Sequence, residues 1–384
     1  MTQIDADWLR SSAARAVTDA LLQRGHQALF VGGCVRNALL GAPVSDLDLS
    51  TDARPEEVIS LAEAKGIKAI PTGIDHGTVT LVHGDTPIEV TTFRADVATD
   101  GRHADVRFSN DVSEDAERRD FTMNALYCDA AGALIDPTGH GLSDLQARRV
   151  RFVGLPARRV REDYLRILRF FRFHAWYADP AGGVDAEGLA ACAEGAEGLS
   201  RISAERIGAE MKKLLSAPDP APALGAMARS GVLAQVLPGA DAETAFRFIT
   251  LSPSDAPIPR LVALGGEDVT TRLRLSRAEA KTHADLTDAA GSGQGAAELS
   301  WRHGSDTARA ILALRAAMTD VPIAHDAEHE ISRGAAAVFP VKPADLMPRY
   351  EGAALGRRLA ALENAWLVSG MTASRADLLA RPQE

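Results

Sequence analysis

Two aspartates separated by one residue are the clearest chemical signal near the N-terminus. Asp46 and Asp48 lie in VSDLDLST, which alternates apolar and polar residues as a strand does. Because residues i and i+2 of a strand point to the same side, the two carboxylates are expected next to each other. Like charges at that spacing repel unless a cation lies between them, and Mg²⁺ prefers carboxylates together with substrate phosphates. The pair indicates a magnesium site; the alternative is a solvent-facing edge strand with scattered acids.

A glycine pair precedes these aspartates. FVGGCVRNALLG places Gly32 and Gly33 between a predicted strand and a predicted helix, with Arg36 in the first helical turn. Glycines there let backbone N–H groups approach an anion, and the helix N-terminus adds partial positive charge. The segment has neither the GK[ST] of a Walker motif nor GxGxxG, and a glycine turn can also serve tight packing alone. With the aspartates it favours nucleotidyl transfer.

Charge is distributed unevenly along the chain. The 384 residues contain 42 Lys plus Arg against 52 Asp plus Glu, a net charge of −10. Yet residues 147–174 hold nine arginines and two acids. A local basic stripe can attract a phosphate backbone or a triphosphate even when the net charge of the protein is negative. The alternative is that these arginines form a solvent-exposed helix face without a binding role. The stripe therefore keeps a nucleic-acid or nucleotide partner open despite the acidic total.

Composition excludes several classes of protein. The three cysteines lie far apart and no CxxC occurs, which excludes a zinc ribbon or a dithiol redox centre. No apolar run reaches the roughly 18 residues of a membrane span, and MTQIDADWLR resembles neither a secretory nor a transit peptide. We therefore expect a cytoplasmic protein without a membrane partner.

The chain changes character near residue 150. The first part alternates predicted helices and β-branched strands, among them GTVTLVHG and TPIEVTTF around a turn. Beyond about residue 155 strand signals almost vanish, and helical periods dominate, as in ARRVREDYLRILRFFRFHAWY. We predict an α+β protein with a head at residues 1–150, a helical neck at 151–238 and a helical body and tail at 239–384. The last 140 residues carry no motif that we can attach to chemistry.

At this point the sequence resembles a known family. GGCVRNALLGAPVSDLDLSTDA is similar to the nucleotidyltransferase head of the polymerase-β superfamily, class II, which comprises CCA-adding enzymes and bacterial poly(A) polymerases. The likeness continues at HGTVTL, IEVTTFRADVATDGRHADV, AERRDFTMNALY, GLSDLQARRVRFVG and REDYLRILRFFRF, roughly over residues 28–175. One departure is Asn37, where the family usually has Asp. The resemblance implies a polymerase-β-like head with a mixed sheet, followed by an all-helical neck, body and tail.

The resemblance also implies roles for individual residues. It assigns Mg²⁺ binding to Asp46 and Asp48, and it makes Glu89 a candidate third carboxylate, for which a structural role is the alternative. It assigns nucleotide contacts to Gly33 and Arg36, and triphosphate binding to Arg119. The chemistry would be attack of an RNA 3′-hydroxyl on an α-phosphoryl group with release of pyrophosphate.

An arginine-rich helix would then read the base. Asp163, Arg166, Arg169 and Arg172 recur every three residues of a predicted helix. The family's motif of this kind assigns recognition of a Watson–Crick edge to Asp163 and Arg166, with Arg169 and Arg172 as further nucleotide contacts. Since an ionised Asp only accepts hydrogen bonds and Arg only donates, such a pair suits cytosine and adenine and rejects the carbonyl of uracil and guanine. The alternative is a simple intrahelical ion pair.

The segment RADVATDGRHADVRF is similar to the family's flexible loop, which is associated with switching from C to A addition. Arg94, Asp96 and Arg102 are its candidate functional positions. Without the resemblance, this is a polar loop between strands.

These observations predict template-independent addition of CCA to the 3′ end of tRNA, with CTP, ATP and Mg²⁺. Two alternatives remain open: a bacterial poly(A) polymerase with the same head, and a non-catalytic RNA-binding protein. The helical body would contact the tRNA acceptor stem by shape and phosphate contacts. The Ala-rich helices could equally form a homodimer interface.

Overall fold

The computed structural model describes the chain except for residues 1, 101–102, 253 and 383–384. It divides into two compact units. The first comprises Met1–Ala242 with Gly266–Leu275, and the second comprises Glu243–Gly265 with Ser276–Glu384. Across the described residues, no helix combines the length and the hydrophobicity that a membrane span requires.

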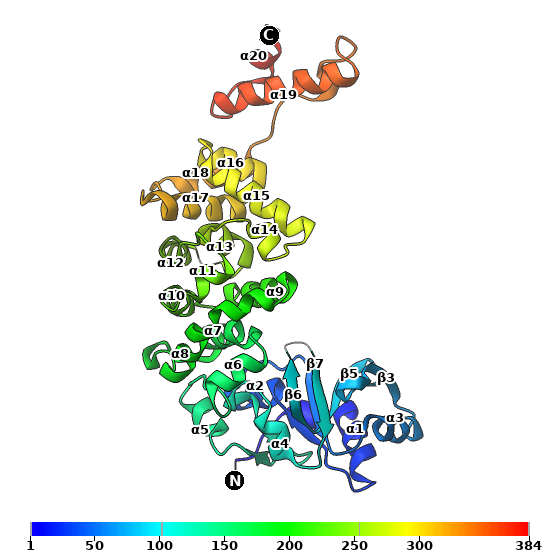
Figure 1. The fold of residues 1–384 in the computed structure, drawn as a ribbon. Coiled ribbons are helices and arrows are strands. Elements are labelled where there is room, and N and C mark those ends of the chain that lie inside the picture. The colour runs from blue at the N-terminus through cyan, green and yellow to red at the C-terminus, as the bar shows by residue number, and fades with distance from the viewer. Residues whose placement is uncertain (1, 101–102, 253, 383–384) are drawn as a thin grey trace. The chain divides into compact units, whose positions relative to one another are not determined.

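A seven-stranded sheet forms the centre of the first unit, in the order β3-β4-β5-β2-β1-β8-β9 (Figure 1). Its pairs are antiparallel except for β2 and β5, which run parallel. The strands are β1 (Leu29–Val31), β2 (Leu47–Thr51), β3 (Lys68–Gly73), β4 (Thr78–His83), β5 (Thr86–Thr92), β8 (Tyr127–Cys128) and β9 (Leu134–Ile135). The mixed sheet confirms the predicted head architecture.

Burial explains why these segments form strands. Val79, Leu81, Ile88 and Val90 alternate with more exposed residues along β4 and β5 and are fully buried. The turn between the two strands contains Gly84, whose φ of 61° suits glycine. The predicted hairpin is therefore confirmed.

Helices cover the sheet and cap its strands. α1 (Ser12–Leu22) and α3 (Pro55–Ala64) contact β4 and β5, while α2 (Gly33–Leu40) follows β1 and contacts β1 and β2. A short 3₁₀ helix, η1 (Asp7–Arg10), precedes α1. The remaining short elements are η2 (Ile74–His76), α4 (Val112–Glu117), η3 (Thr122–Asn124) and α5 (Gly141–Gln146).

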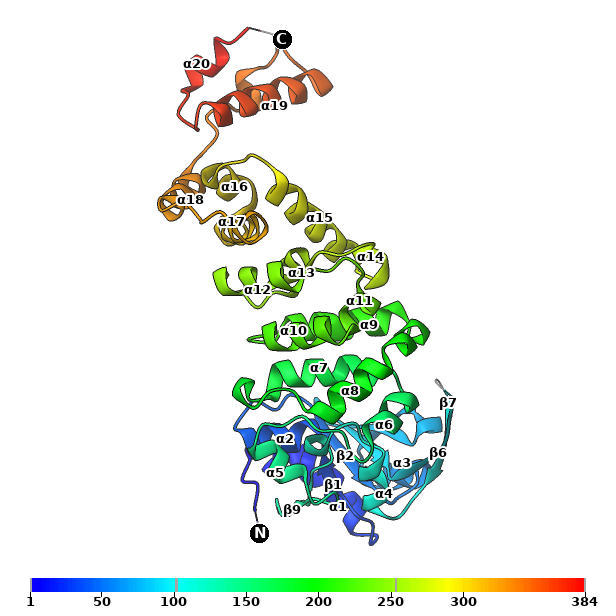
Figure 2. The same cartoon turned by 60° about the vertical axis from the view of Figure 1, so that its left-hand side comes forward.

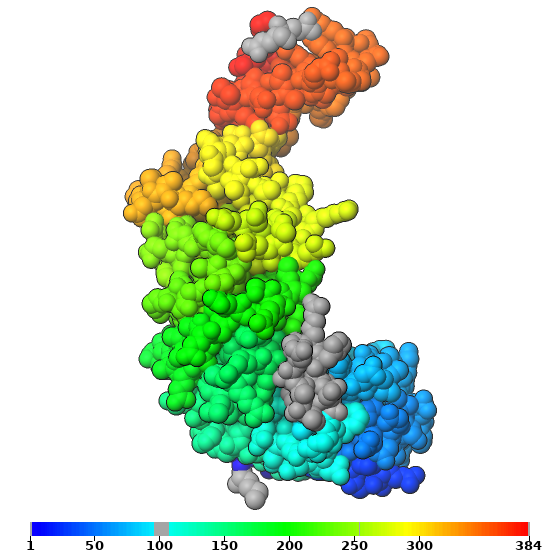
Figure 3. Space-filling view, viewed as in Figure 1, coloured from blue at the N-terminus to red at the C-terminus, as the bar shows by residue number. Residues whose placement is uncertain are grey.

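The neck, residues 151–238, consists of helices (Figure 2). α7 contacts α6, α9 and α10, and an aromatic cluster of Phe121, Phe152, Phe170 and Phe173 joins α7 to the head. In the space-filling view, the blue and cyan head and the green neck form one continuous surface (Figure 3). The elements from the neck to the end of the first unit are α6 (Pro156–Glu162), α7 (Leu165–Tyr177), η4 (Pro180–Gly182), α8 (Ala186–Glu194), η5 (Ala196–Arg201), α9 (Ala204–Leu215), α10 (Ala221–Arg229), α11 (Val232–Val236) and α14 (Val269–Arg272).

One predicted helix is wrong in its extent. The periodicity across residues 157–177 indicates a single helix, but the chain breaks at Asp163, whose φ of −151° and ψ of 106° are extended. α6 ends at Glu162 and α7 begins at Leu165. Asp163 therefore lies in a turn between two helices and not on the helical face that carries Arg166, Arg169 and Arg172.

The second unit is helical among its described residues. Its last part has a small core of its own, built from Val341, Leu346, Leu362, Trp366 and Leu378. The helices are α12 (Ala242–Leu251), α13 (Pro257–Leu264), α15 (Arg277–Gly291), α16 (Ala296–His303), α17 (Ser305–Thr319), α18 (Ala327–Ala336), η6 (Pro343–Asp345), α19 (Gly352–Val368) and α20 (Arg375–Leu379). The α+β fold class with a helical second part is confirmed, while the three-domain division stays a prediction.

Candidate active site

The paired aspartates lie at the start of a central strand. Leu47 and Leu49 of β2 are buried, so Asp48 between them points to the opposite side of the sheet, and Asp46 directly precedes the strand. The Asp46 carboxylate accepts a hydrogen bond from the Ser45 hydroxyl at 2.8 Å. Asp46 is exposed and Asp48 is half-buried, so a ligand can approach both.

Glu89 joins the pair through the parallel register of β2 and β5, which places it directly opposite Asp48. Burial, the charge of Glu89 and the charge of Asp46 raise the pKa of Asp48, and Arg119 opposes them. Three carboxylates that repel one another favour a divalent cation. Among the described residues, no group of three His, Cys, Asp or Glu side chains is placed to hold a metal ion by itself, so a cation here would need further ligands. This donor set fits Mg²⁺, which usually completes its coordination with water and substrate phosphates.

The glycine turn lies beside this row of acids. Gly32 has φ 72° and is the N-cap of α2, as the sequence predicts. A Cβ built on Gly32 would lie 3.6 Å from a terminal nitrogen of Arg119. Gly33 is the first residue of α2, so its N–H group belongs to the helix N-terminus. The turn thus brings a helix N-terminus and a guanidinium together.

Arg119 is held by three buried partners, Tyr127, Asp115 and Ser50. Its Nε donates to the Tyr127 hydroxyl at 2.9 Å, and a terminal nitrogen donates to Asp115 at 3.0 Å. The Tyr127 hydroxyl donates to the same carboxylate at 2.8 Å. Burial alone would raise the pKa of Asp115, but Arg119 and Arg118 outweigh it and lower that pKa to about 2. The carboxylate stays ionised and fixes Arg119 near the glycine turn.

Arg36 is buried between the head and α7. Its side chain donates to Asn124 at 2.6 Å and to the Tyr177 hydroxyl at 2.9 Å, and it stacks 4.1 Å from the Tyr177 ring centroid. The same guanidinium donates to the Asn37 amide oxygen at 2.9 Å, while the Asn37 amide nitrogen donates to the Pro43 carbonyl. Arg36 thereby links the glycine turn to the neck, and Asn37 supports the turn. Nucleotide binding by Arg36 stays a prediction.

The side chains of the predicted base readers, Asp163 and Arg166, bind different partners. Asp163 accepts from Arg206 of α9 at 2.7 Å, and Arg166 donates to Glu162 at 2.6 Å. Arg166 also donates to the backbone carbonyls of Arg159 and Arg118 at 3.1 and 2.9 Å. It is thus tied to the head as well as to the neck. Different residues therefore position Asp163 and Arg166. Base recognition by this pair stays a prediction.

The other two arginines of α7 hold buried acids. Arg169 donates to Asp120 at 2.8 Å, and Arg172 donates to Glu210 of α9 at 2.6 Å. Burial opposes ionisation of Asp120, yet Arg169 and Asn124 lower its pKa to about 2. Asp120 therefore stays ionised and holds Arg169 in place. In this structure Arg169 and Arg172 connect elements, and nucleotide contacts by them stay predictions.

The predicted flexible loop is a two-stranded hairpin of β6 (Arg94–Asp100) and β7 (His103–Phe108). Arg94 donates to the backbone carbonyl of His76, which ties the base of the hairpin to the head. Asp96 lies in β6, opposite Val106. Arg102 lies outside the described residues.

Sequence reasoning missed Asp115, Tyr127, Arg206 and Glu210 as partners of the site. Asp115 lies four residues before Arg119, a spacing that could have indicated an ion pair. Nothing in the local sequence connects Glu210 with Arg172 or Arg206 with Asp163, because each contact joins α9 to an earlier segment.

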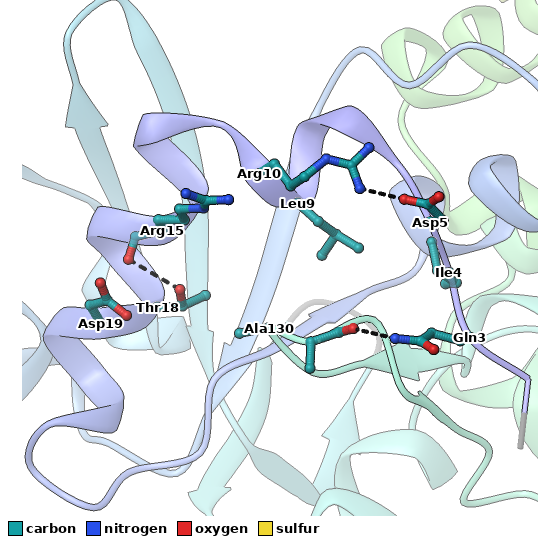
Figure 4. Close-up of a pocket in the computed structure, with 10 residues that line it drawn as sticks. Gln3, Ile4, Asp5, Leu9, Arg10, Arg15, Thr18, Asp19 and Ala130 are labelled. Carbon is teal, nitrogen blue, oxygen red and sulfur yellow. Dashed lines mark hydrogen bonds and ion pairs between the residues drawn. The ribbon is translucent and has the colours of Figure 1, made fainter.

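Two cavities lie outside this site. One of about 730 Å³ is lined by residues that include Arg118, Arg151 and Leu155, and another of about 530 Å³ lies between the N-terminal segment and α1. In the second, Arg10 pairs with Asp5 and the Gln3 amide donates to the Ala131 carbonyl (Figure 4). Neither cavity is lined by Asp46, Asp48 or Asp163, so we do not assign the reaction to them.

Comparison with known proteins places this geometry in a family. Residues 28–151 match a poly A polymerase head domain, and residues 184–244 match a probable RNA and SrmB-binding site of polymerase A. A CCA-adding enzyme of Geobacillus kaustophilus is 35% identical over 350 residues, which cover 86% of this chain and 83% of that protein. The chain belongs to the CCA-adding enzyme family.

Further similarities support the membership. The crystal structure of the Bacillus stearothermophilus CCA-adding enzyme in complex with CTP has a TM-score of 0.75 and 30% identity, and covers 93% of both chains. The human mitochondrial CCA tRNA nucleotidyltransferase 1 is 42% identical over 208 residues, 54% of this chain. This chain spans about half the length of that relative, 48%. The CCA-adding enzyme fold thus extends over both units, while identity to the human protein is confined to about half of the chain.

Proposed function

We propose that this protein adds C, C and A to the 3′ end of tRNA without a nucleic-acid template, using CTP, ATP and Mg²⁺. The observation that carries the proposal is the row of three carboxylates, Asp46, Asp48 and Glu89, next to Arg119 and the glycine turn. The carboxylates can bind the metal ion, and the arginine and the helix N-terminus can bind the phosphates of a metal-bound triphosphate. Membership of the CCA-adding enzyme family supports the same reaction.

Different residues of the site would bind the metal ion and the triphosphate. Asp46 and Asp48 would hold Mg²⁺, with Glu89 as a further acid on the neighbouring strand. When bound, the metal lowers the pKa of the RNA 3′-hydroxyl and neutralises charge on the α-phosphoryl group. Arg119 and the N–H group of Gly33 bind the triphosphate and orient it.

The reaction then exchanges one phosphorus–oxygen bond for another. The bond from the 3′-oxygen to the α-phosphorus forms, the bond from the α-phosphorus to the bridging oxygen breaks, and pyrophosphate leaves with that oxygen. The hydroxyl proton goes to solvent or to a neighbouring carboxylate. Because the protein forms no covalent bond in this step, its contribution is positioning and electrostatics.

Base choice would lie with Asp163 and Arg166. The carboxylate accepts from the exocyclic amino group of cytosine or adenine, and the guanidinium donates to the ring nitrogen beside it. Uracil and guanine present a carbonyl oxygen to the carboxylate, which leaves both without a donor and costs about 1–3 kcal/mol or more. The turn between α6 and α7, which carries Asp163, and the first turn of α7, which carries Arg166, would thus form the base-binding part of the site.

The partners follow from the reaction. The protein would bind tRNA lacking its terminal CCA, together with CTP and ATP, and the helices of the second unit would contact the tRNA by shape and phosphate. Self-association through the Ala-rich helices stays a prediction, which sedimentation of the purified protein tests.

A tRNA-extension assay tests the proposal. Purified protein is incubated with tRNA that lacks CCA, with Mg²⁺ and either ATP alone or ATP plus CTP, and products are resolved at single-nucleotide length. We expect three added residues ending in A when both nucleotides are present. A long tail made from ATP alone would instead indicate a poly(A) polymerase. Incorporation of labelled CTP that persists in Asp48→Ala would contradict the role given to Asp48. A wild-type protein that binds tRNA but incorporates neither nucleotide would contradict the catalytic proposal and favour an RNA-binding protein.

A further inference from the structure

The carboxylate of Asp163 is held from two sides. One oxygen accepts from the backbone N–H of Leu165 at 3.0 Å, and the other accepts from a terminal nitrogen of Arg206 at 2.7 Å. An ionised carboxylate offers about four acceptor positions, so each oxygen can accept a further donor. The side chains of Asp163 and Arg206 are 29% and 43% exposed. A nucleobase can therefore reach this carboxylate while Arg206 stays in place.

The backbone that carries Asp163 is clamped. We call Asp163 and Tyr164 the reader turn. The Tyr164 ring lies against Gly198 of η5, where a Cβ would come within 2.1 Å of the ring. Arg201 covers the same ring, with its guanidinium carbon 5.6 Å from the centroid. Because neighbours of the neck fix the turn, the direction of the Asp163 carboxylate is decided by its side-chain torsions and by the groups that bind it.

The contacts of Arg206 are separate from those of Arg166, the second residue of the reading pair. Arg166 is anchored by Glu162 and by the carbonyls of Arg159 and Arg118. Arg206 comes from the first turn of α9, and its guanidinium binds the Asp163 carboxylate and none of the groups that anchor Arg166. Removing the Arg206 side chain would therefore release one oxygen of the Asp163 carboxylate, while the Leu165 N–H keeps the other oxygen and the anchors of Arg166 remain.

We propose that Arg206 is a specificity-determining positioning residue, which fixes the Asp163 carboxylate in the direction that accepts an exocyclic amino group. The inference rests on the proposed function and extends it to a residue outside the reading pair. A fixed carboxylate meets the carbonyl of uracil or guanine with oxygen against oxygen, and it cannot turn away to relieve the contact. A carboxylate that has lost Arg206 and keeps the Leu165 N–H bond can turn further, so it binds cytosine and adenine more weakly and tolerates the carbonyl bases better.

The test compares Arg206→Ala and Arg206→Lys with the wild type. For each protein, kcat and KM are measured for CTP, ATP and UTP on tRNA that lacks CCA. In Arg206→Ala we expect KM for CTP and ATP to rise about tenfold, kcat to change less than about twofold, and the preference for CTP over UTP to fall about tenfold, as expected for one charge-assisted hydrogen bond. Arg206→Lys keeps the charge and should recover part of the preference.

Glu205→Ala is the matched control. Glu205 is the neighbour of Arg206 on α9, and its ion pair with Arg274 at 3.3 Å is exposed, with 62% and 67% of the two side chains accessible. We expect wild-type kinetics from this variant. Thermal melting of all variants separates altered reading from altered folding.

A double-mutant cycle decides whether Arg206 acts through Asp163. In an Asp163→Asn background, Arg206→Ala should cause no further loss of the CTP preference. Additive losses in the two variants would overturn the inference, as would an equal fall of kcat for every nucleotide in Arg206→Ala. Wild-type preference in both Arg206 variants would overturn it while the proposed function stands. A wild-type protein that extends no tRNA would overturn both.

Discussion

Replacing Asp48 by Asn should make the protein more stable and catalytically inactive. Asp48 lies opposite Glu89 in the β2–β5 register and near Asp46, and these charges together with burial raise its pKa. A carboxyl group with a raised folded-state pKa binds its proton more tightly in the folded protein than in the unfolded chain. Folding is therefore opposed by ionisation of Asp48 at neutral pH. Asn keeps the shape of the side chain and removes the repelled charge.

The size of the effect follows from the pairing. Like charges directly opposite each other on neighbouring strands cost about 0.2–1 kcal/mol, and burial of the charge acts in the same direction. We expect Asp48→Asn to raise the free energy of unfolding by about 1 kcal/mol in the absence of divalent ions. For a unit of this size, that corresponds to a rise in Tm of about 2–4 °C. Incorporation of CTP should fall by about 10³-fold, as when one preorganised electrostatic group is removed.

The pH dependence has a defined sign. Below the ordinary Asp value of 3.8, the carboxyl is protonated in both states and the penalty is absent. The penalty grows as the pH rises through the folded-state pKa and is complete above it. The stability difference between Asp48→Asn and the wild type should therefore be largest near neutral pH and shrink toward pH 4.

Thermal melts in EDTA and in Mg²⁺, with CTP incorporation measured in parallel, check this reasoning. Mg²⁺ should raise the Tm of the wild type and leave Asp48→Asn nearly unchanged, because binding to the folded state stabilises it. Asp85→Asn, in the exposed β4–β5 turn, should behave as the wild type. An Asp48→Asn protein that melts below the wild type in EDTA would refute the repulsion on which the argument depends.

Three further outcomes follow from other contacts. The stability contributed by Asp120, whose pKa is lowered to about 2, should be lost as the pH falls from about 4 toward 2, and Asp120→Asn should flatten the acid limb of a circular-dichroism titration. Gly198→Ala should cost about 1–3 kcal/mol in urea unfolding because of the Tyr164 ring, whereas Gly182→Ala, with its nearest contact at 3.8 Å, should cost much less. Trp366→Ala, at a site 2% exposed in the core of the last helices, should cost about 3–5 kcal/mol there, and limited proteolysis of residues 338–382 should become faster.

Much of the head could be predicted from local pattern. The alternation around Asp46 and Asp48 places both acids opposite the buried leucines of β2, as the structure has them. The glycine pair lies between a strand and a helix because φ at Gly32 requires glycine. Both features depend only on residues that are close together in the chain, so they can be predicted from the sequence without knowledge of the tertiary structure.

The helix break at Asp163 could not be predicted in that way. Apolar residues continue at helical spacing from α6 into α7, and no Pro or Gly interrupts them. The break occurs where Tyr164 packs on Gly198 of η5 and Arg206 of α9 binds Asp163, contacts that come from different elements. Tertiary packing here outweighs local periodicity.

The sequence by itself determined which chemical groups are available: an acidic pair on a strand, a glycine turn before a helix, and a series of arginines with one acid. Only the tertiary structure decided which groups meet. The parallel pairing of β2 with β5 brings Glu89 to Asp48, and α9 supplies Arg206 to Asp163 and Glu210 to Arg172. The physical reason is that local backbone preference acts between neighbours in the chain, whereas charges and side chains interact through space across elements far apart in sequence.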